Sequence, residues 1–270
     1  MKVFDVHTHV FPDAIASRAI EVLRERSHGL PVYWDGTAAG LEVNALRAGY
    51  TAWMNCPVVT NLHQMHSVNT LCIERNHWPH LSLGGLYPQG PTDELLAEID
   101  RIAKAGLYGI KLHPEYQQFS PLDSSLEPIW QSLIDHNLPV LFHAGLDIAY
   151  IRGEQCNHPR DFAELARRWP KLVIICAHLG GWLNWQEVES QLVGAPVYLD
   201  TAFVKQWMAD QSQFERIIRK HGIDHVLFGT DSPWNDLSRG IREITELNLS
   251  DAEKQQILYG NAAKLFHLPQ

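Results

Sequence analysis

The sequence contains few cysteines and has no excess of positive charge. Its 270 residues include 4 cysteines, none of which forms a Cys-x-x-Cys pair. They are typical of reduced cytosolic thiols, rather than of a disulfide framework or a thiolate zinc site. The net charge is −9, so we expect no general affinity for nucleic-acid phosphates, although a local basic groove stays open.

Long apolar runs are also absent. No segment is long enough to cross a bilayer, and the N-terminus shows no signal-peptide pattern, because Val3-Phe4 is followed by polar residues. We therefore expect a cytoplasmic protein without a membrane partner. With 45% apolar and 20% charged residues, the chain has a globular composition and is long enough for one large α/β domain or two small ones.

The pattern that is present alternates short apolar segments with amphipathic ones. Strands are expected near residues 2–4, 50–56, 81–86, 108–113, 138–143, 172–178, 197–200 and 225–228. The fourth to sixth of these are apolar throughout, as in a parallel sheet covered on both faces. About eight such strand–helix units fill roughly 250 residues when they close into a barrel. A doubly wound open sheet is the alternative, but no Gly-x-Gly-x-x-Gly motif follows an early strand.

Local signals place some of the connecting segments. Residues 13–26 are expected to form a helix capped by Asp13. Residues 28–40 are rich in glycine and proline and are expected to form a loop over the front of the domain. The Ser250-x-x-Glu253 pattern predicts a capping box at the start of a late helix.

Histidines follow several of the predicted strands. His7 and His9 lie two residues apart, so on a strand both would point to one face. In a barrel, polar groups at the C-terminal strand ends converge on one mouth. The residues expected there are His7, His9, Lys111, His113, His143, His178 and Asp231. A single histidine in such a place often only caps a turn or bonds inside the core, but three histidines and a carboxylate together suit a divalent ion such as zinc.

The chain resembles the amidohydrolase superfamily, in particular its amidohydrolase-related (amidohydrolase-2) branch. The matching motifs are Asp5-Val6-His7-Thr8-His9, Gly109-Ile110-Lys111-Leu112-His113-Pro114, Phe142-His143-Ala144-Gly145, Ala177-His178-Leu179-Gly180-Gly181, Gly229-Thr230-Asp231-Ser232-Pro233-Trp234 and Gly260-Asn261-Ala262-Ala263-Lys264-Leu265-Phe266. Each motif alone is weakly specific, but the six in this order are highly specific. The resemblance implies a distorted (β/α)8 TIM barrel, formed by residues 1–270 as a single domain, with a metal site at the C-terminal mouth of the strands.

The resemblance also implies roles for the residues at that mouth. His7, His9, His143 and Asp231 would bind the first metal, for which zinc is favoured. Asp231 would also be the catalytic base. His178 would be the acid/base in relatives with one ion, or would bind a second ion, together with Lys111, in relatives with two.

Three residues are candidates for contact with a substrate, and each has a simpler interpretation. Lys111 could be carboxylated and bridge two metals, could pair with a substrate carboxylate, or could only reach solvent. His113 could contact substrate or only close its strand. Trp234 belongs to a set of aromatic residues in the front loops that could wall a pocket or pack against the barrel. The others are Tyr33, Trp34, Trp182 and Trp185.

Four functions are compatible with these residues. The first is a metal-dependent hydrolase that uses a metal-activated water on a small-molecule ester, lactone or amide. The second is a metal-dependent, non-oxidative decarboxylase of a small aromatic or enoic acid. A metal-dependent deoxyribonuclease is disfavoured by the acidic charge, and because that branch usually has an acidic residue where this chain has Lys111. A non-catalytic metal-binding barrel would leave His178 unused. The sequence names no substrate and leaves a homo-oligomer open.

Overall fold

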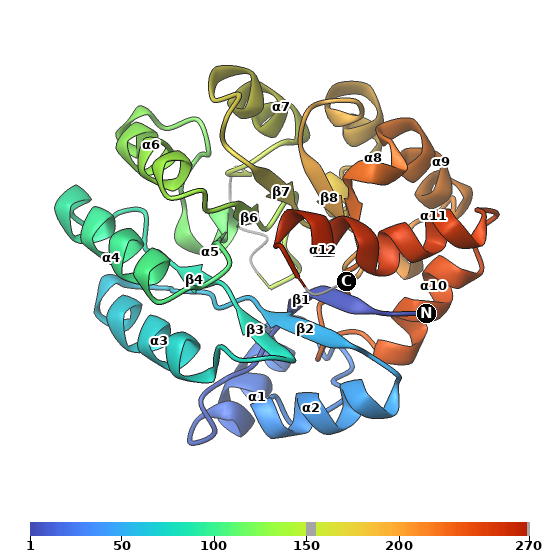
Figure 1. Cartoon of the computed structure of the whole chain (residues 1–270), viewed down its shortest axis with the longest axis horizontal. Helices are drawn as coiled ribbons and strands as arrows, with labels where there is room; N and C mark the ends of the chain where they lie inside the picture. The colour runs from blue at the N-terminus through green and yellow to red at the C-terminus, as the bar shows by residue number, and fades with distance from the viewer. Residues whose placement is uncertain (150–154, 269–270) are drawn as a thin grey trace.

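Parallel strands form the centre of the molecule and helices surround them (Figure 1). The computed structural model describes residues 1–149 and 155–268. In that part of the chain the strands are β1 (Phe4–Thr8), β2 (Ala52–Asn55), β3 (His80–Ser82), β4 (Gly84–Gly85), β5 (Ile110–Leu112), β6 (Val140–Phe142), β7 (Ile174–Cys176), β8 (Tyr198–Asp200) and β9 (Val226–Leu227). They pair in the orders β1-β2-β3 and β4-β5-β6-β7-β8-β9. Because β3 and β4 are separated only by Leu83, they occupy one position, and eight positions result.

Backbone hydrogen bonds join these two sheets into a ring. The amide of Val6 donates to the carbonyl of Phe228 just after β9 (2.9 Å), and the amide of Asp231 donates to the carbonyl of His7 in β1 (2.8 Å). At the other junction, the amide of Leu83 donates to the carbonyl of Asn55 at the end of β2 (3.0 Å). The expected distorted (β/α)8 barrel is confirmed, and the open doubly wound sheet is excluded.

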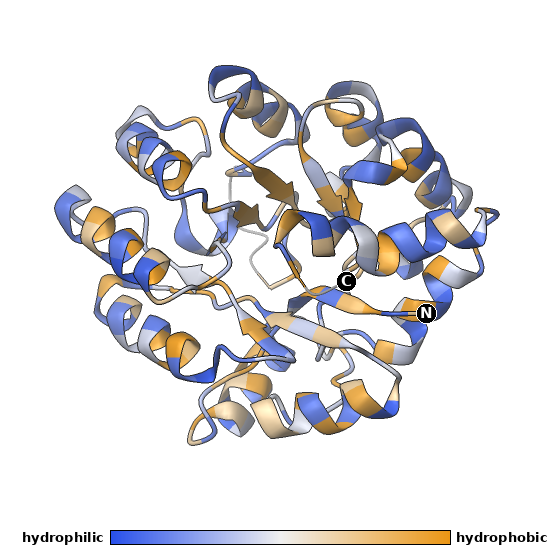
Figure 2. Ribbon diagram, in the orientation of Figure 1, coloured by the Kyte–Doolittle hydropathy of each residue, from blue (hydrophilic) through white to orange (hydrophobic). Residues whose placement is uncertain are grey.

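The helices cover the outside of the ring and separate successive strands. The longer ones are α1 (Ala16–Arg26), α2 (Ala38–Arg47), α3 (Leu62–Arg75), α4 (Thr92–Lys104), α6 (Glu127–Asp135), α7 (Pro159–Arg168), α9 (Ser212–His221) and α10 (Leu237–Thr245); the shorter ones are α5 (Pro114–Gln117), α8 (Trp185–Glu187), α11 (Asp251–Gln255) and α12 (Asn261–Leu265). Figure 2 shows helices that alternate hydrophobic and hydrophilic positions, as expected when one face packs on a sheet. None of the described helices is long and apolar enough to span a membrane.

The C-terminal helix α12 covers the end of the barrel at which the strands begin. Phe266 packs against Phe4 at the start of β1, with ring centroids 6.3 Å apart. Behind Phe4 the barrel is filled by buried apolar side chains, among them Val6, Met54 and Leu141. Since this end is closed by packed side chains, the polar residues lie at the opposite end, where the strands finish.

The first helix begins later than the sequence indicated. Its N-cap is Ile15, which makes no side-chain capping bond, and the predicted cap Asp13 instead pairs with Arg75 of α3 (3.1 Å). The prediction was wrong because a turn, closed by the Ile15 amide and the Pro12 carbonyl (2.9 Å), intervenes. The predicted capping box of Ser250 is confirmed.

The predicted front loop of residues 28–40 is also shorter than expected. Helix α2 begins at Ala38, where the side chain of Thr37 accepts a hydrogen bond from the amide of Gly40 (2.9 Å). No helix was predicted in the following residues. The reason is that Val43 and Leu46, two of its apolar residues, are 55% exposed, so the apolar positions do not mark the buried face.

Candidate active site

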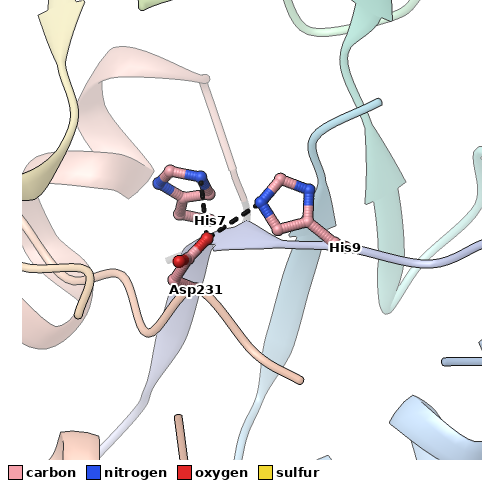
Figure 3. Close-up of side chains that lie close together, drawn as sticks. All are labelled: His7, His9 and Asp231. Atoms are coloured by element: carbon pink, nitrogen blue, oxygen red, sulfur yellow. Dashed lines mark hydrogen bonds and ion pairs between the residues drawn. The ribbon is translucent and has the colours of Figure 1, made fainter. Parts of the chain in front are cut away.

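Three of the predicted metal ligands converge where β1 ends and β9 continues into its loop. The Nε2 atom of His9 lies 2.9 Å from Oδ1 of Asp231, and Nε2 of His7 lies 3.4 Å from the same oxygen. His7 is buried, whereas His9 and Asp231 keep 15% and 14% of their side chains exposed. Figure 3 shows both rings turned toward the carboxylate. The site can therefore be reached from the mouth.

The other ring nitrogens of these two histidines are held by oxygen atoms. Nδ1 of His9 lies 2.8 Å from the carbonyl oxygen of Cys56, and Nδ1 of His7 lies 2.8 Å from Oδ2 of Asp200. A carbonyl or carboxylate can only accept, so the ring protons are assigned to Nδ1. In the neutral rings each Nε2 then carries a lone pair. Two lone pairs beside a carboxylate oxygen repel one another unless a cation lies among them, and these atoms are ligands that a divalent ion such as zinc takes. The donor set fits such an ion.

His143 and His178 form a second pair beside this group. Among the described residues, His143 is not grouped with the three ligand atoms of His7, His9 and Asp231. Its Nδ1 lies 3.0 Å from Nε2 of His178. The other ring nitrogen of each is hydrogen-bonded to a backbone carbonyl. Nε2 of His143 donates to the carbonyl of Leu146 (3.0 Å), and Nδ1 of His178 donates to the carbonyl of Ala202 (2.8 Å). Two bare nitrogens therefore face each other and need a proton or a cation between them.

The two pairs of histidines are neighbours. The ring of His178 lies 5.3 Å from the ring of His7 between centroids. The imidazoles of His7, His9, His143 and His178 thus belong to one cluster. In each ring one nitrogen is hydrogen-bonded to an oxygen atom, and the other nitrogen faces the cluster without a proton of its own.

Lys111 is buried inside this cluster. It is 1% exposed, and its Nζ lies 3.1 Å from Nε2 of His7. Burial lowers the pKa of its ammonium group, against the attraction of Asp200 and Asp231. The interpretation of Lys111 as a strand-end lysine that reaches solvent was wrong, because the closed ring of strands encloses it. Its ammonium group donates to the lone pair of His7.

A further group of possible ligands fits a second ion poorly. His113, His143 and Asp147 have ligand atoms within 4.8 Å of one another. However, the rings of His113 and His143 are stacked, 4.0 Å apart at 8°, so their lone pairs lie in two separate, nearly parallel planes and do not meet. Nδ1 of His113 accepts a bond from the amide of Tyr116 (3.2 Å), which leaves its Nε2 facing Asp147 at 3.5 Å. This arrangement suits contact with a substrate better than metal binding.

Asp200 is a member of the site that the sequence interpretation missed. It is the last residue of β8 and is completely buried. Its Oδ1 accepts hydrogen bonds from the amides of His178 (2.9 Å) and Ala202 (3.0 Å), and its Oδ2 contacts His7. The sequence feature that could have revealed Asp200 is its place as a carboxylate at the end of a predicted strand. Asp231 follows another predicted strand in the same way.

The aromatic residues of the front loops mainly pack against the barrel. The indole Nε1 of Trp34 donates to Oγ of Ser232 (2.6 Å), and that of Trp185 donates to the carbonyl of His178 (3.1 Å). They therefore support the loops that carry the site. Trp182 is buried as well, whereas Trp234 is partly buried and Tyr33 is 38% exposed.

A family model described as amidohydrolase matches residues 4–268. The chain belongs to the amidohydrolase family. It is an enzyme, and the resemblance inferred from its six motifs is confirmed. No curated protein matches the sequence.

Solved structures resemble this amidohydrolase along nearly its whole length. An uncharacterized TIM-barrel protein from Bordetella bronchiseptica has 18% identity and a TM-score of 0.79, with 99% of each chain covered. The 5-carboxyvanillate decarboxylase of Sphingomonas paucimobilis has 15% identity and a TM-score of 0.71, with 99% of each chain covered. A dihydroxybenzoic acid decarboxylase from Polaromonas, with bound manganese and 2-nitroresorcinol, has 15% identity and a TM-score of 0.71, with 100% of this chain and 98% of that chain covered. At these identities the likeness shows the fold alone.

Family membership and the donor set together support a divalent metal ion in this amidohydrolase. The candidate ligand atoms come from distant parts of the chain, and the closure of the ring between β9 and β1 brings them together.

Proposed function

We propose that this enzyme is a metal-dependent hydrolase of a small-molecule ester, lactone or amide. The observation that carries the proposal is the convergence of two bare imidazole nitrogens, from His7 and His9, on one oxygen of Asp231. These atoms would hold the ion, and we assign His143 to it as well, as the resemblance implies. A nitrogen-rich set favours zinc, while the Polaromonas structure contains manganese.

A divalent cation in this place supplies Lewis-acid polarisation of a substrate oxygen and makes nearby water more acidic. Asp231 is suited to take the proton of the attacking water. Its Oδ1 faces the histidines, and within the described part of the chain its Oδ2 makes no hydrogen bond. Burial raises the pKa of Asp231, but its contacts with His9 and His7 lower it by more, so the pKa lies below its ordinary value. The carboxylate is therefore ionised at neutral pH and can accept a proton.

Two further side chains complete the proposed reaction. When Nε2 of His178, which lies beside His143, carries a proton, it can stabilise the developing oxyanion or protonate the leaving group. The ammonium group of Lys111, enclosed at 1% exposure, adds positive charge where negative charge develops. Both act in a buried environment, in which electrostatic interactions are stronger than in water.

Non-oxidative decarboxylation is the second candidate. It is favoured by the similar structures of decarboxylases that act on substituted benzoates and by the buried ammonium group of Lys111, which suits a substrate carboxylate. In that reaction a proton held on Nε2 of His178 would be delivered to the carbon that loses carbon dioxide.

A reconstitution experiment tests the proposal. The purified protein is treated with a chelator, reloaded with Zn²⁺ or Mn²⁺, and given a panel of lactones, esters, amides and hydroxybenzoic acids. We expect acid release from the first three classes, only in the loaded protein, and its loss in Asp231→Asn. Carbon dioxide release without acid release would instead establish the second candidate.

Metal content provides a check that does not depend on the substrate. We expect about one ion per chain, and a loss of this ion in His9→Gln. The matched control is His63→Gln, because His63 is exposed on α3. If the wild-type protein binds no divalent ion, both candidate reactions are wrong.

We also propose a cytoplasmic location. It is supported by the four cysteines, all of which are free, and by burial, which raises the pKa of Cys72 to about 12 and that of Cys176 well above its ordinary value. Such thiols are inert and structural.

A further inference from the structure

We propose that Asp200 is a positioning residue that fixes His7 in its metal-binding tautomer and, through the backbone, sets the place of His178. The proposal rests on the proposed metal site and adds to it a residue outside the predicted ligand set. Asp200 lies behind His7, on the side away from Asp231, because it contacts Nδ1 whereas Asp231 faces Nε2.

The hydrogen bonds of Asp200 divide between its two oxygens. Oδ1 accepts two backbone amides, those of His178 (2.9 Å) and Ala202 (3.0 Å). Oδ2 lies 2.8 Å from Nδ1 of His7. Because Asp200 and His7 are 0% and 1% exposed, water does not compete for these bonds. The carboxylate can accept all three, and by accepting from Nδ1 it keeps the lone pair of His7 on Nε2.

The same carboxylate organises His178. Its Oδ1 binds the amide of His178 and the amide of Ala202, and the carbonyl of Ala202 accepts the ring proton of His178 at 2.8 Å. The buried carboxylate of Asp200 therefore holds the backbone of both residues in place. Through that group the position of His178 is coupled to the orientation of His7.

Asparagine at position 200 separates these functions, because it replaces one acceptor oxygen by a donor. The two amide bonds to Oδ1 can be kept by the amide oxygen of the asparagine. Its NH₂ group then faces Nδ1 of His7, which has to become the acceptor. The ring proton of His7 moves to Nε2, the nitrogen that faces Asp231. A protonated Nε2 cannot bind a metal ion.

The test compares the metal-free and metal-bound forms of wild type and Asp200→Asn. In metal-free protein with ¹⁵N-labelled histidine, NMR reports the tautomer, and the His7 signal is assigned by its loss in His7→Gln. We expect the Nδ1–H tautomer in wild type and the Nε2–H tautomer in Asp200→Asn. Calorimetric titration with Zn²⁺ is expected to show a dissociation constant weaker by about 10- to 100-fold in the variant.

Asp5→Asn is the matched control. Asp5 is also a completely buried strand carboxylate that accepts two backbone amides on Oδ1, but its Oδ2 meets a hydroxyl group, that of Thr230. A hydroxyl can donate or accept, so the asparagine keeps its bonds. We expect the His7 tautomer to be unchanged in this variant and the Zn²⁺ affinity to stay within about threefold of wild type.

The outcomes separate the proposal from its alternatives. Weaker Zn²⁺ binding with an unchanged tautomer would show that Asp200 acts only through its charge, and the proposal would be wrong. The Nε2–H tautomer in the wild type would overturn it without any variant, which covers the case that Asp200→Asn does not fold. A wild type that has the Nδ1–H tautomer but binds no ion would refute the proposed function and leave the role of Asp200 in orienting His7 standing.

Discussion

Replacing Asp5 by asparagine is expected to stabilise the protein increasingly as the pH rises from 5 to 8. Asp5 is completely buried beneath the site, where its Oδ1 accepts the amides of His7 (2.9 Å) and Thr230 (3.1 Å) and its Oδ2 meets the Thr230 hydroxyl (2.5 Å). Burial raises its pKa from 3.8 to about 8, although the bonds from Thr230 and His7 act in the opposite direction. The folded protein therefore holds a proton that the unfolded chain has released.

The magnitude follows from the linkage between proton binding and folding. Between the unfolded pKa of 3.8 and the folded pKa of about 8, the folded state binds one proton more, so the free energy of unfolding falls by about 1.4 kcal/mol per pH unit. The asparagine side chain carries no such proton, so the free energy of unfolding of Asp5→Asn does not show this decrease. The stability of Asp5→Asn relative to wild type should rise by about 2.7 kcal/mol from pH 5 to pH 7 and level off above pH 8. In a chain of this size that corresponds to a change of roughly 5–10 °C in the difference between the melting temperatures.

Urea unfolding of both proteins at pH 5, 6, 7 and 8 measures this difference. Asp135→Asn is the control for replacing a carboxylate by an amide at the surface, since Asp135 is exposed on α6. If the relative stability of Asp5→Asn does not change with pH, or falls as the pH rises, then Asp5 is ionised in the folded protein and the reasoning from burial is wrong.

Two other substitutions test the geometry of the site. Lys111→Met removes a cation that lies 3.1 Å from Nε2 of His7, so Zn²⁺ should bind at least about tenfold more tightly in a calorimetric titration; weaker binding would instead indicate that a carboxylated Lys111 is itself a ligand. In Gly145→Ala the new Cβ would lie 2.2 Å from the backbone nitrogen of Trp182, at a φ of +91°, and urea unfolding should show a loss of about 3 kcal/mol or more. Gly106→Ala, with a φ of +75° and no atom within 4 Å of the new Cβ, should lose only about 1–2 kcal/mol; equal losses would mean that the contact with Trp182 is unimportant.

The sequence by itself determined the barrel and the approximate place of its chemistry. Eight apolar segments alternating with amphipathic ones fit a closed parallel sheet, and most were found close to their predicted positions; the first strand, expected near residues 2–4, is instead formed by Phe4–Thr8. The convergence of His7, His9 and Asp231 could be expected because parallel strands end at the same side of a barrel. Local patterns failed where apolar residues do not face the core, as in α2.

Only the tertiary structure decided which atoms of these residues are free to react. The tautomer of His7 depends on Asp200, which is 193 residues away in the sequence, and that of His178 depends on a carbonyl in the next strand's loop. Lysine side chains usually reach solvent, yet Lys111 is enclosed because strands from both halves of the chain surround it. Hydrogen-bond partners and burial arise from contacts between distant segments, so no local pattern contains them.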